Sequence, residues 1–259
     1  MQNNRKKNSL IVAGLVAVYI GMHILAKRMV EDETIDNNNS YIDRFDTQPK
    51  KESSIYLDVV KPILDKVLSF GGLVILLPLF VGIGLAVWLD DPGPIFFTQK
   101  RIGKNKHYIF IHKFRTMALS APHDVPTHQL NNPEQYITKV GRVLRKTSLD
   151  EIPQLWDIFR GRMSIIGPRP ALWNQSDLVA ERDKYGANDV MPGLTGFAQI
   201  RGRDELLISD KARLDGEYVK ILCAGGRRAF MQDVWCFVGT IGSILKHDGV
   251  VEGGTGNLG

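Results

Sequence analysis

The sequence predicts a helix-rich α/β domain that associates with a membrane. Two uncharged apolar segments lie within the first 89 residues, and the polar remainder combines short strand-like runs with apolar residues at helical spacing. With 259 residues, 44% of them hydrophobic and 24% charged, the chain can bury a sizeable core. This composition excludes a wholly disordered chain and a fibre, and two cysteines are too few for a disulfide framework.

The first apolar segment, residues 10–26, carries no formal charge, and basic residues stand on both sides of it. A helix needs about 20 apolar residues to cross the hydrocarbon layer, so this segment is a membrane candidate. A cleaved signal peptide is the alternative, but no small-residue cleavage site follows the apolar run. We therefore favour a retained anchor at 1–30, followed by a polar, solvated linker at 31–60.

The second apolar segment, residues 67–89, contains several glycines and has Pro78 near its centre. Proline removes a backbone hydrogen bond and kinks a helix. A kinked spanning helix would put its two ends on opposite sides of the membrane, whereas a re-entrant helix would return both ends to one side. By sequence alone the spanning helix is slightly favoured. Just before this segment, Lys61 and Asp65 stand four residues apart and are predicted to pair along the helix.

The rest of the chain predicts alternating strands and helices. Short strands are expected at 95–99 and 108–111 around a basic loop at 100–107, and an irregular proline-containing segment at 118–135. A short amphipathic helix is expected after Leu149. The further helical candidates are residues 178–185, 212–222 and 234–245.

The densest group of charges contains the adjacent acids Asp150 and Glu151. One interpretation is structural: Ser148 and Glu151 have the spacing of a capping box, and Asp150 in the first turn would complement the helix dipole. Pro153 weakens this interpretation, because a helix capped at Ser148 would place proline where a backbone donor is wanted. Local pattern alone still favours the cap.

The second interpretation is functional and rests on the surrounding basic residues. Four arginines lie near the two acids: Arg145, Arg160, Arg162 and Arg169. Arg169 sits in a rigid Gly-Pro-Arg-Pro turn at 167–170, which suits bidentate phosphate binding by its guanidinium. Lys113 and Arg115 follow a strand, and Arg203 follows a glycine-containing loop. Acids ringed by cations beside a membrane segment indicate phosphate chemistry on a lipid or a nucleotide.

On these motifs residues 61–250 resemble the bacterial sugar transferase family, the monotopic phosphoglycosyl transferases, and leave 251–259 as a flexible tail. The resemblance rests on stretches that are specific in combination and in order: 113–117 (KFRTM), 145–154 (RKTSLDEIPQ), 161–164 (GRMS), 167–170 (GPRP) and 192–196 (PGLTG). The chain also departs from the family. Pro62 stands where the family often has arginine, Phe197 where it often has tryptophan, and Arg201 where it often has asparagine, so Arg201 would add a charge beside the phosphate site.

The resemblance implies transfer of a sugar 1-phosphate from a UDP-sugar to polyprenyl (undecaprenyl) phosphate, with release of UMP. This reaction would take place at the cytoplasmic face of the bacterial inner membrane, as the first membrane step in the synthesis of a polysaccharide such as exopolysaccharide, capsule or O-antigen. The family's re-entrant helix, broken at a proline, matches 67–89 with Pro78. The resemblance therefore reverses the preference for a spanning helix, because donor and lipid acceptor must meet at one interface.

The resemblance also implies roles for individual residues. Asp150 would attack the β-phosphate of the donor and become a covalent acyl-phosphate, and Glu151 would complete the catalytic pair. The two acids would hold Mg²⁺. The residues expected to bind substrate phosphate are Lys113, Arg115, Arg145, Arg169 and Arg203. A carboxylate needs no general base at neutral pH, and we expect a helix start to lower the pKa of Asp150.

Two alternatives remain open at this point. One is a membrane-bound hydrolase that passes the same aspartyl-phosphate to water, and the other is a membrane-tethered scaffold whose arginines hold anionic lipid. The net charge of +5 fits an anionic partner and calls for no nucleic acid. The expected partners are the UDP-sugar, polyprenyl phosphate and membrane lipid, with a second copy of the chain as a further candidate.

Overall fold

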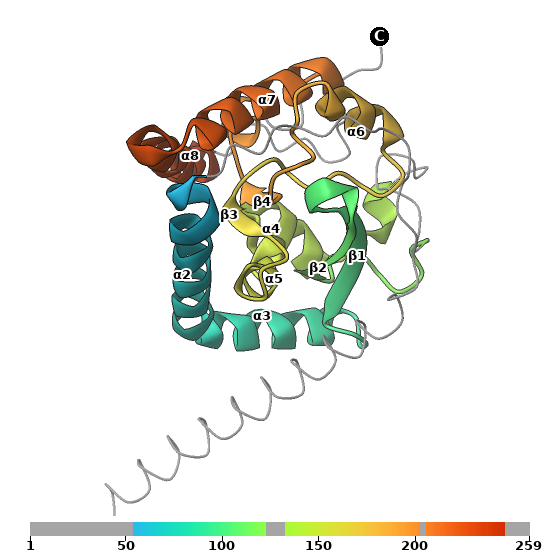
Figure 1. Cartoon of the computed structure of the whole chain (residues 1–259). Helices are drawn as coiled ribbons and strands as arrows, with labels where there is room; N and C mark the ends of the chain where they lie inside the picture. The colour runs from blue at the N-terminus through green and yellow to red at the C-terminus, as the bar shows by residue number, and fades with distance from the viewer. Residues whose placement is uncertain (1–53, 123–132, 203–205, 247–259) are drawn as a thin grey trace, which may run out of the picture.

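The computed structural model describes residues 54–122, 133–202 and 206–246 (Figure 1). The anchor predicted for 1–30 and the tail predicted for 251–259 lie outside the described residues. The described part is rich in helix and contains two small sheets, which confirms the expected helix-rich α/β class.

The elements alternate between short helices, short strands and four longer helices. In chain order they are η1 (Tyr56–Val60), α2 (Lys61–Ile75), α3 (Leu77–Asp90), β1 (Phe96–Ile102), η2 (Lys104–Lys106), β2 (Tyr108–Phe114), η4 (Pro133–Tyr136), α4 (Lys139–Thr147), η5 (Leu149–Glu151), α5 (Gln154–Phe159), β3 (Ser164–Ile166), α6 (Ser176–Asp183), β4 (Gly193–Thr195), η6 (Gln199–Arg201), α7 (Ile208–Ala224) and α8 (Gly226–Lys246). The first is a π-helix and the other η elements are 3-10 helices. The three helices predicted near the C-terminus are confirmed as α6, α7 and α8, each with an earlier start.

A bent helix pair forms two sides of the molecule (Figure 1). The axis turns by 63° between Tyr56–Ile75 and Leu77–Asp90. The break is at Leu76, two residues before Pro78, which has no N–H to continue the hydrogen bonding of the preceding turn. Within the described ranges no single helix has the length and apolar character to cross a membrane, whereas this bent pair has both taken together. The pair begins at Tyr56, so the linker predicted for 31–60 ends earlier than expected.

The two sheets are both two-stranded. Strands β1 and β2 form the predicted antiparallel hairpin, with Phe96 opposite Phe114 and Ile102 opposite Tyr108. Both strands run longer than predicted. Strands β3 and β4 pair in parallel, and a Cβ at Gly193 would collide with the backbone of Gly167, so this glycine allows β4 to lie against the turn that follows β3.

A buried carboxylate joins the start of the bent pair to the C-terminal helix. Asp233 of α8 accepts hydrogen bonds from the Tyr56 hydroxyl at 2.6 Å, the Lys61 ammonium at 2.7 Å and the Tyr218 hydroxyl at 2.8 Å. Both charges of this ion pair are buried, so each is stable there only while the other is present and hydrogen-bonded to it. It therefore fixes where α2 leaves the domain.

The predicted ion pair between Lys61 and Asp65 is wrong. Lys61 binds Asp233, and Asp65 instead accepts hydrogen bonds from the Ser164 hydroxyl at 2.7 Å and the Ile165 N–H at 3.0 Å. Helical spacing places the two residues near each other, but each side chain hydrogen-bonds to a residue on another element and is buried there. Asp65 thereby ties α2 to β3.

We predict that Asp233→Ala lowers the free energy of unfolding by about 3–5 kcal/mol, because it removes the carboxylate that pairs directly with the buried Lys61 ammonium and accepts from two tyrosine hydroxyls. Denaturant unfolding of the full chain in detergent micelles measures this loss. Asp210→Ala is the matched control: it removes an exposed carboxylate paired with Arg213 and should change stability by less than about 1 kcal/mol. An equal, small effect of both substitutions would contradict the assignment.

Candidate active site

The two acids lie in a tight turn between two helices. Helix α4 ends at Ser148, which has a left-handed backbone with φ of 56°, and the 3-10 helix η5 carries both Asp150 and Glu151. Helix α5 begins after Pro153, which occupies its N-cap position and so needs no backbone donor. The capping-box interpretation is wrong: Ser148 makes no side-chain cap, and the Glu151 carboxylate is used elsewhere.

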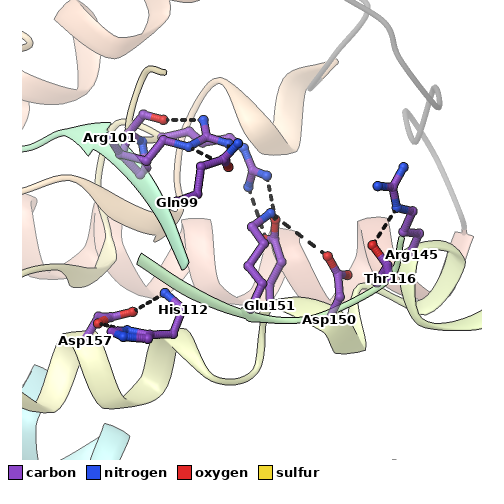
Figure 2. Close-up of polar contacts among 11 residues, drawn as sticks. Gln99, Arg101, His112, Thr116, Arg145, Asp150, Glu151 and Asp157 are labelled. Carbon is purple, nitrogen blue, oxygen red and sulfur yellow. Dashed lines mark hydrogen bonds and ion pairs between the residues drawn. The ribbon is translucent and has the colours of Figure 1, made fainter. Parts of the chain in front are cut away.

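Glu151 is held by two cations from distant segments (Figure 2). The Lys113 ammonium, from β2, lies 2.7 Å from Oε1, and the Arg169 guanidinium donates to both oxygens, at 2.5 Å to Oε1 and 3.1 Å to Oε2. Burial by itself raises the pKa of Glu151, but the charges and hydrogen bonds of Arg169 and Lys113 outweigh it and hold the pKa well below its ordinary value. These two cations therefore favour the ionised form of Glu151.

Asp150 has a different environment although it is the next residue. Its carboxylate lies 4.0 Å from the Lys113 ammonium and accepts no hydrogen bond within the described part of the chain. Burial raises the pKa of Asp150, and the charge of Glu151 raises it further, while Lys113, Arg145 and Arg169 oppose both effects. The expectation that a helix start lowers this pKa is wrong, because Asp150 lies in a buried turn. Two neighbouring acids with opposite shifts are typical of a catalytic pair.

The other basic residues predicted for the site divide into two groups. Arg145 donates from Nε to the Thr116 hydroxyl at 2.9 Å, and its charge acts on Asp150, so it belongs to the site (Figure 2). Arg115 does not join the acids: its guanidinium binds the side chain and the carbonyl of Asp91, where it fastens the end of α3. Arg203 lies outside the described residues.

The turn that presents Arg169 is clamped by two arginines that the sequence analysis did not identify. Arg182 donates to the Arg169 carbonyl at 2.8 Å, and Arg101 donates to the Pro170 carbonyl at 3.0 Å. Arg182 is itself fixed by two hydrogen bonds to the buried Asp215 carboxylate, at 2.8 and 2.6 Å. In the sequence Arg182 reads as an ordinary helix charge, and only the fold places it behind the turn.

A histidine–aspartate pair fixes the strand that carries Lys113. Asp157 of α5 accepts from the backbone N–H of His112 at 2.9 Å and lies 2.7 Å from its ring Nδ1 (Figure 2). Both side chains are almost fully buried. The pair locks β2 to α5, so the neighbouring Lys113 and the acids before α5 keep one relative position. This pair was also missed, since 45 residues separate its members.

The two carboxylates could bind a magnesium ion only if substrate phosphates supplied further oxygen ligands. Among the described residues no group of three or more His, Cys, Asp or Glu side chains comes together as a metal site. Two carboxylates are present, and Glu151 already binds two cations. Mg²⁺ commonly uses one or two protein carboxylates together with substrate phosphates, which these residues can satisfy.

Arg201 contacts two aromatic rings. Its guanidinium stacks over the ring of Phe197 at 4.3 Å and near the ring of Trp235 in α8 at 5.5 Å. It forms no ion pair with Asp150 or Glu151 in the part of the chain that the structure describes. Arg201 is also not among the charges that shift the pKa of either acid, and the expectation that it adds a charge beside the phosphate site stays a prediction.

Comparison with known proteins gives one family over most of the chain. A family model described as bacterial sugar transferase matches residues 56–247. The chain is 37% identical over 149 residues to a UDP-glucose:undecaprenyl-phosphate glucose-1-phosphate transferase of Xanthomonas campestris pv. campestris, which matches 57% of this chain and 31% of that protein.

Two other relatives differ in the share that matches. An exopolysaccharide production protein ExoY of Sinorhizobium fredii is 35% identical over 176 residues, which cover 62% of this chain and 77% of that protein. A UDP-galactose-lipid carrier transferase of Erwinia amylovora is 33% identical over 221 residues, covering 77% of this chain and 42% of that protein. The chain thus spans less than half the length of the named UDP-sugar transferases that it matches.

Proposed function

Because the chain belongs to the bacterial sugar transferase family, we propose that it transfers a sugar 1-phosphate from a UDP-sugar to undecaprenyl phosphate and releases UMP. The observation that carries the proposal is the acid pair: Asp150 has no hydrogen-bond donor among the described residues, while Glu151 beside it is held by Lys113 and Arg169. The names of the relatives support a UDP-sugar donor and an undecaprenyl-phosphate acceptor. The product would begin the synthesis of an exopolysaccharide or a similar polymer.

The reaction proceeds in two displacements at phosphorus. In the first, an Asp150 oxygen bonds to the β-phosphorus, the bond from this phosphorus to the α–β bridging oxygen breaks, and UMP leaves with that oxygen. In the second, a phosphate oxygen of the lipid bonds to the same phosphorus, and the bond to Asp150 breaks and restores the carboxylate. Lys113, Arg145 and Arg169 neutralise the charge that gathers on the phosphate oxygens.

Asp150 and Glu151 are also the residues that would hold Mg²⁺. A bound Mg²⁺ would add charge neutralisation at the phosphates. The lowered pKa of Glu151 favours its ionised form, which suits this role. Its two protein partners limit how far the carboxylate can turn.

The bent pair α2–α3 serves in this proposal as a re-entrant membrane helix. Both of its ends are tied to the same domain: Lys61 binds Asp233, Asp90 accepts from the backbone N–H of Val140 at 2.8 Å, and Asp91 binds Arg115. A spanning helix would separate its ends by the bilayer, whereas these contacts hold both ends to one domain and so support re-entry. Exposed apolar side chains on the outer faces of both helices support lipid contact, among them Val67, Phe70, Ile75, Val81 and Leu85.

The proposal places the domain at the cytoplasmic face of the bacterial inner membrane, with residues 10–26 as an additional anchor. The UDP-sugar is made in the cytoplasm, and a re-entrant helix keeps the acid pair on the side where that donor arrives. The lipid acceptor would reach the same acid pair from the membrane. One surface then serves both substrates in turn.

We predict that the purified full chain releases UMP from a UDP-sugar only when undecaprenyl phosphate and Mg²⁺ are both present. A panel of UDP-sugars with a UMP-detecting assay measures this. Release at the same rate without the lipid would favour the hydrolase, since water would then be the acceptor. No release from any donor would favour the lipid-binding scaffold.

The covalent step predicts a mass adduct. Wild-type protein mixed with the UDP-sugar and Mg²⁺ but no lipid should gain one sugar phosphate on Asp150, and Asp150→Asn should gain none and lose turnover by at least about 10³-fold. Asn has nearly the size of Asp, so the fold should persist. Glu151→Gln should also impair turnover, since it removes the anion that binds Lys113 and Arg169. An adduct that persists in Asp150→Asn would end this mechanism.

The pH dependence follows from the environment of Asp150. The nucleophile must be ionised, so activity falls as the pH drops through a pKa that burial has raised above 3.8. Lys113 lowers this pKa, so Lys113→Met should move the acid limb of the kcat/KM profile to higher pH. Lys146→Met removes an exposed lysine of α4 and should leave the limb in place. A limb that moves to lower pH in Lys113→Met would refute the assignment.

A further inference from the structure

An arginine rests on two aromatic rings at the surface, where α8 meets η6. Arg201 is exposed, its guanidinium lies 4.3 Å from the centre of the Phe197 ring, and the Phe197 and Trp235 rings are 5.6 Å apart. The guanidinium donates no hydrogen bond within the described ranges, and Trp235 is 47% exposed. A charged donor group is thus held in one place with no acceptor among residues 54–122, 133–202 and 206–246.

Stacking of this kind prepares a guanidinium for a phosphate. The ring face holds the planar group by cation–π attraction and leaves the N–H edges free to point outward. The fork of donors matches the spacing of phosphate oxygens, and a pre-positioned side chain loses little further entropy when it binds. The chemistry that Arg201 recognises is therefore an anionic phosphate.

The face of α8 around this arginine is apolar. Its exposed large side chains are Phe230, Met231, Val234, Trp235, Phe237, Val238 and Ile241. Arg227 and Arg228 are exposed in the first turn, and the only acid of α8, Asp233, is buried against Lys61. A helix with an exposed apolar face, basic residues and no exposed acid has the chemistry of an interfacial membrane helix.

This face continues onto the bent helix pair. The ring of Phe230 packs edge-on against Tyr56 of η1, with 6.1 Å between the ring centres. Ile55 and Val59 beside it are 80% and 51% exposed. Figure 1 shows α8 next to the start of α2. The apolar surface of α8 and that of the proposed re-entrant helix therefore adjoin each other.

We propose that Arg201, held over Phe197 and Trp235, binds the phosphate of a membrane lipid headgroup while the exposed face of α8 lies in the bilayer interface. The occupant is a phospholipid, because the N–H edge of the guanidinium lies beside an apolar surface. A soluble phosphate would leave that surface exposed to water, whereas the acyl chains of a lipid would cover it. In this proposal Arg201 forms an anionic lipid site and is not one of the groups that shift the pKa of the acid pair. The inference rests on the proposed membrane association and not on the transfer reaction.

Tryptophan fluorescence tests this proposal in the full chain. The sequence has four tryptophans, so replacing three of them with phenylalanine leaves one reporter at Trp235 in α8, at Trp88 in α3 or at Trp173. Each protein is placed in vesicles of phosphatidylcholine and phosphatidylglycerol with brominated acyl chains. We expect brominated lipid to quench Trp235 and Trp88, and aqueous acrylamide to quench Trp173.

Arg201→Asn isolates the headgroup contact. It should lower the lipid quenching of Trp235 at least about twofold. The lipid quenching of Trp88 should stay unchanged, and this unchanged signal is the control for folding and membrane insertion of the variant. Arg213→Asn removes an exposed arginine of α7 and should change neither signal. Trp235 quenching that survives Arg201→Asn would overturn the phosphate site.

Two other results would overturn the interfacial placement. Strong acrylamide quenching of Trp235 without lipid quenching would put α8 in water. Shielding of Trp235 from both quenchers would assign the face to a second copy of the chain. Neither result depends on UMP release or on the quenching of Trp88, so a failure here is distinguishable from a failure of the proposed transferase or of membrane insertion.

Discussion

The arrangement of this domain depends on keeping two adjacent carboxylates inside it. Glu151 can stay ionised in a buried site only because Lys113 and Arg169 reach it from segments 38 and 18 residues away. The hairpin supplies the first cation and the rigid turn at 167–170 supplies the second. Removing either of these two segments would take one of its two cations from the buried Glu151 carboxylate, so the site depends on how the fold brings these segments together.

The residues behind the site fix each contributing segment in turn. His112 and Asp157 lock the hairpin to α5, and Arg182 with Asp215 holds the carbonyl side of the rigid turn. These contacts hold the two segments that supply cations to Glu151. By contrast, no donor in the described part of the chain binds Asp150, and a carboxylate in that position is available to a phosphorus atom.

Both ends of the bent pair α2–α3 are attached to the same domain. The bent pair leaves the domain beside α8 and returns to it beside α4, so its two ends are held by one body (Figure 1). A helix held in this way can enter a bilayer without crossing it. The exposed apolar face of α8, next to the stacked Arg201, adjoins the bent pair at the point where the pair begins.

The sequence by itself determined the features that depend on neighbours along the chain. The periodicity of apolar side chains predicts the strands of the hairpin and the three C-terminal helices. The missing N–H of Pro78 predicts the nearby helix break. Both effects act over a few residues. The acid pair and the rigid turn were also recognisable as sequence motifs. Only the tertiary structure decided which charges pair. Lys61 stands four residues from Asp65 and yet binds Asp233, 172 residues away, and Asp150 carries a raised pKa although its local pattern suggested a lowered one. Coulomb energy and desolvation depend on distance and burial in space, and these are set by the packing of elements that are remote in sequence.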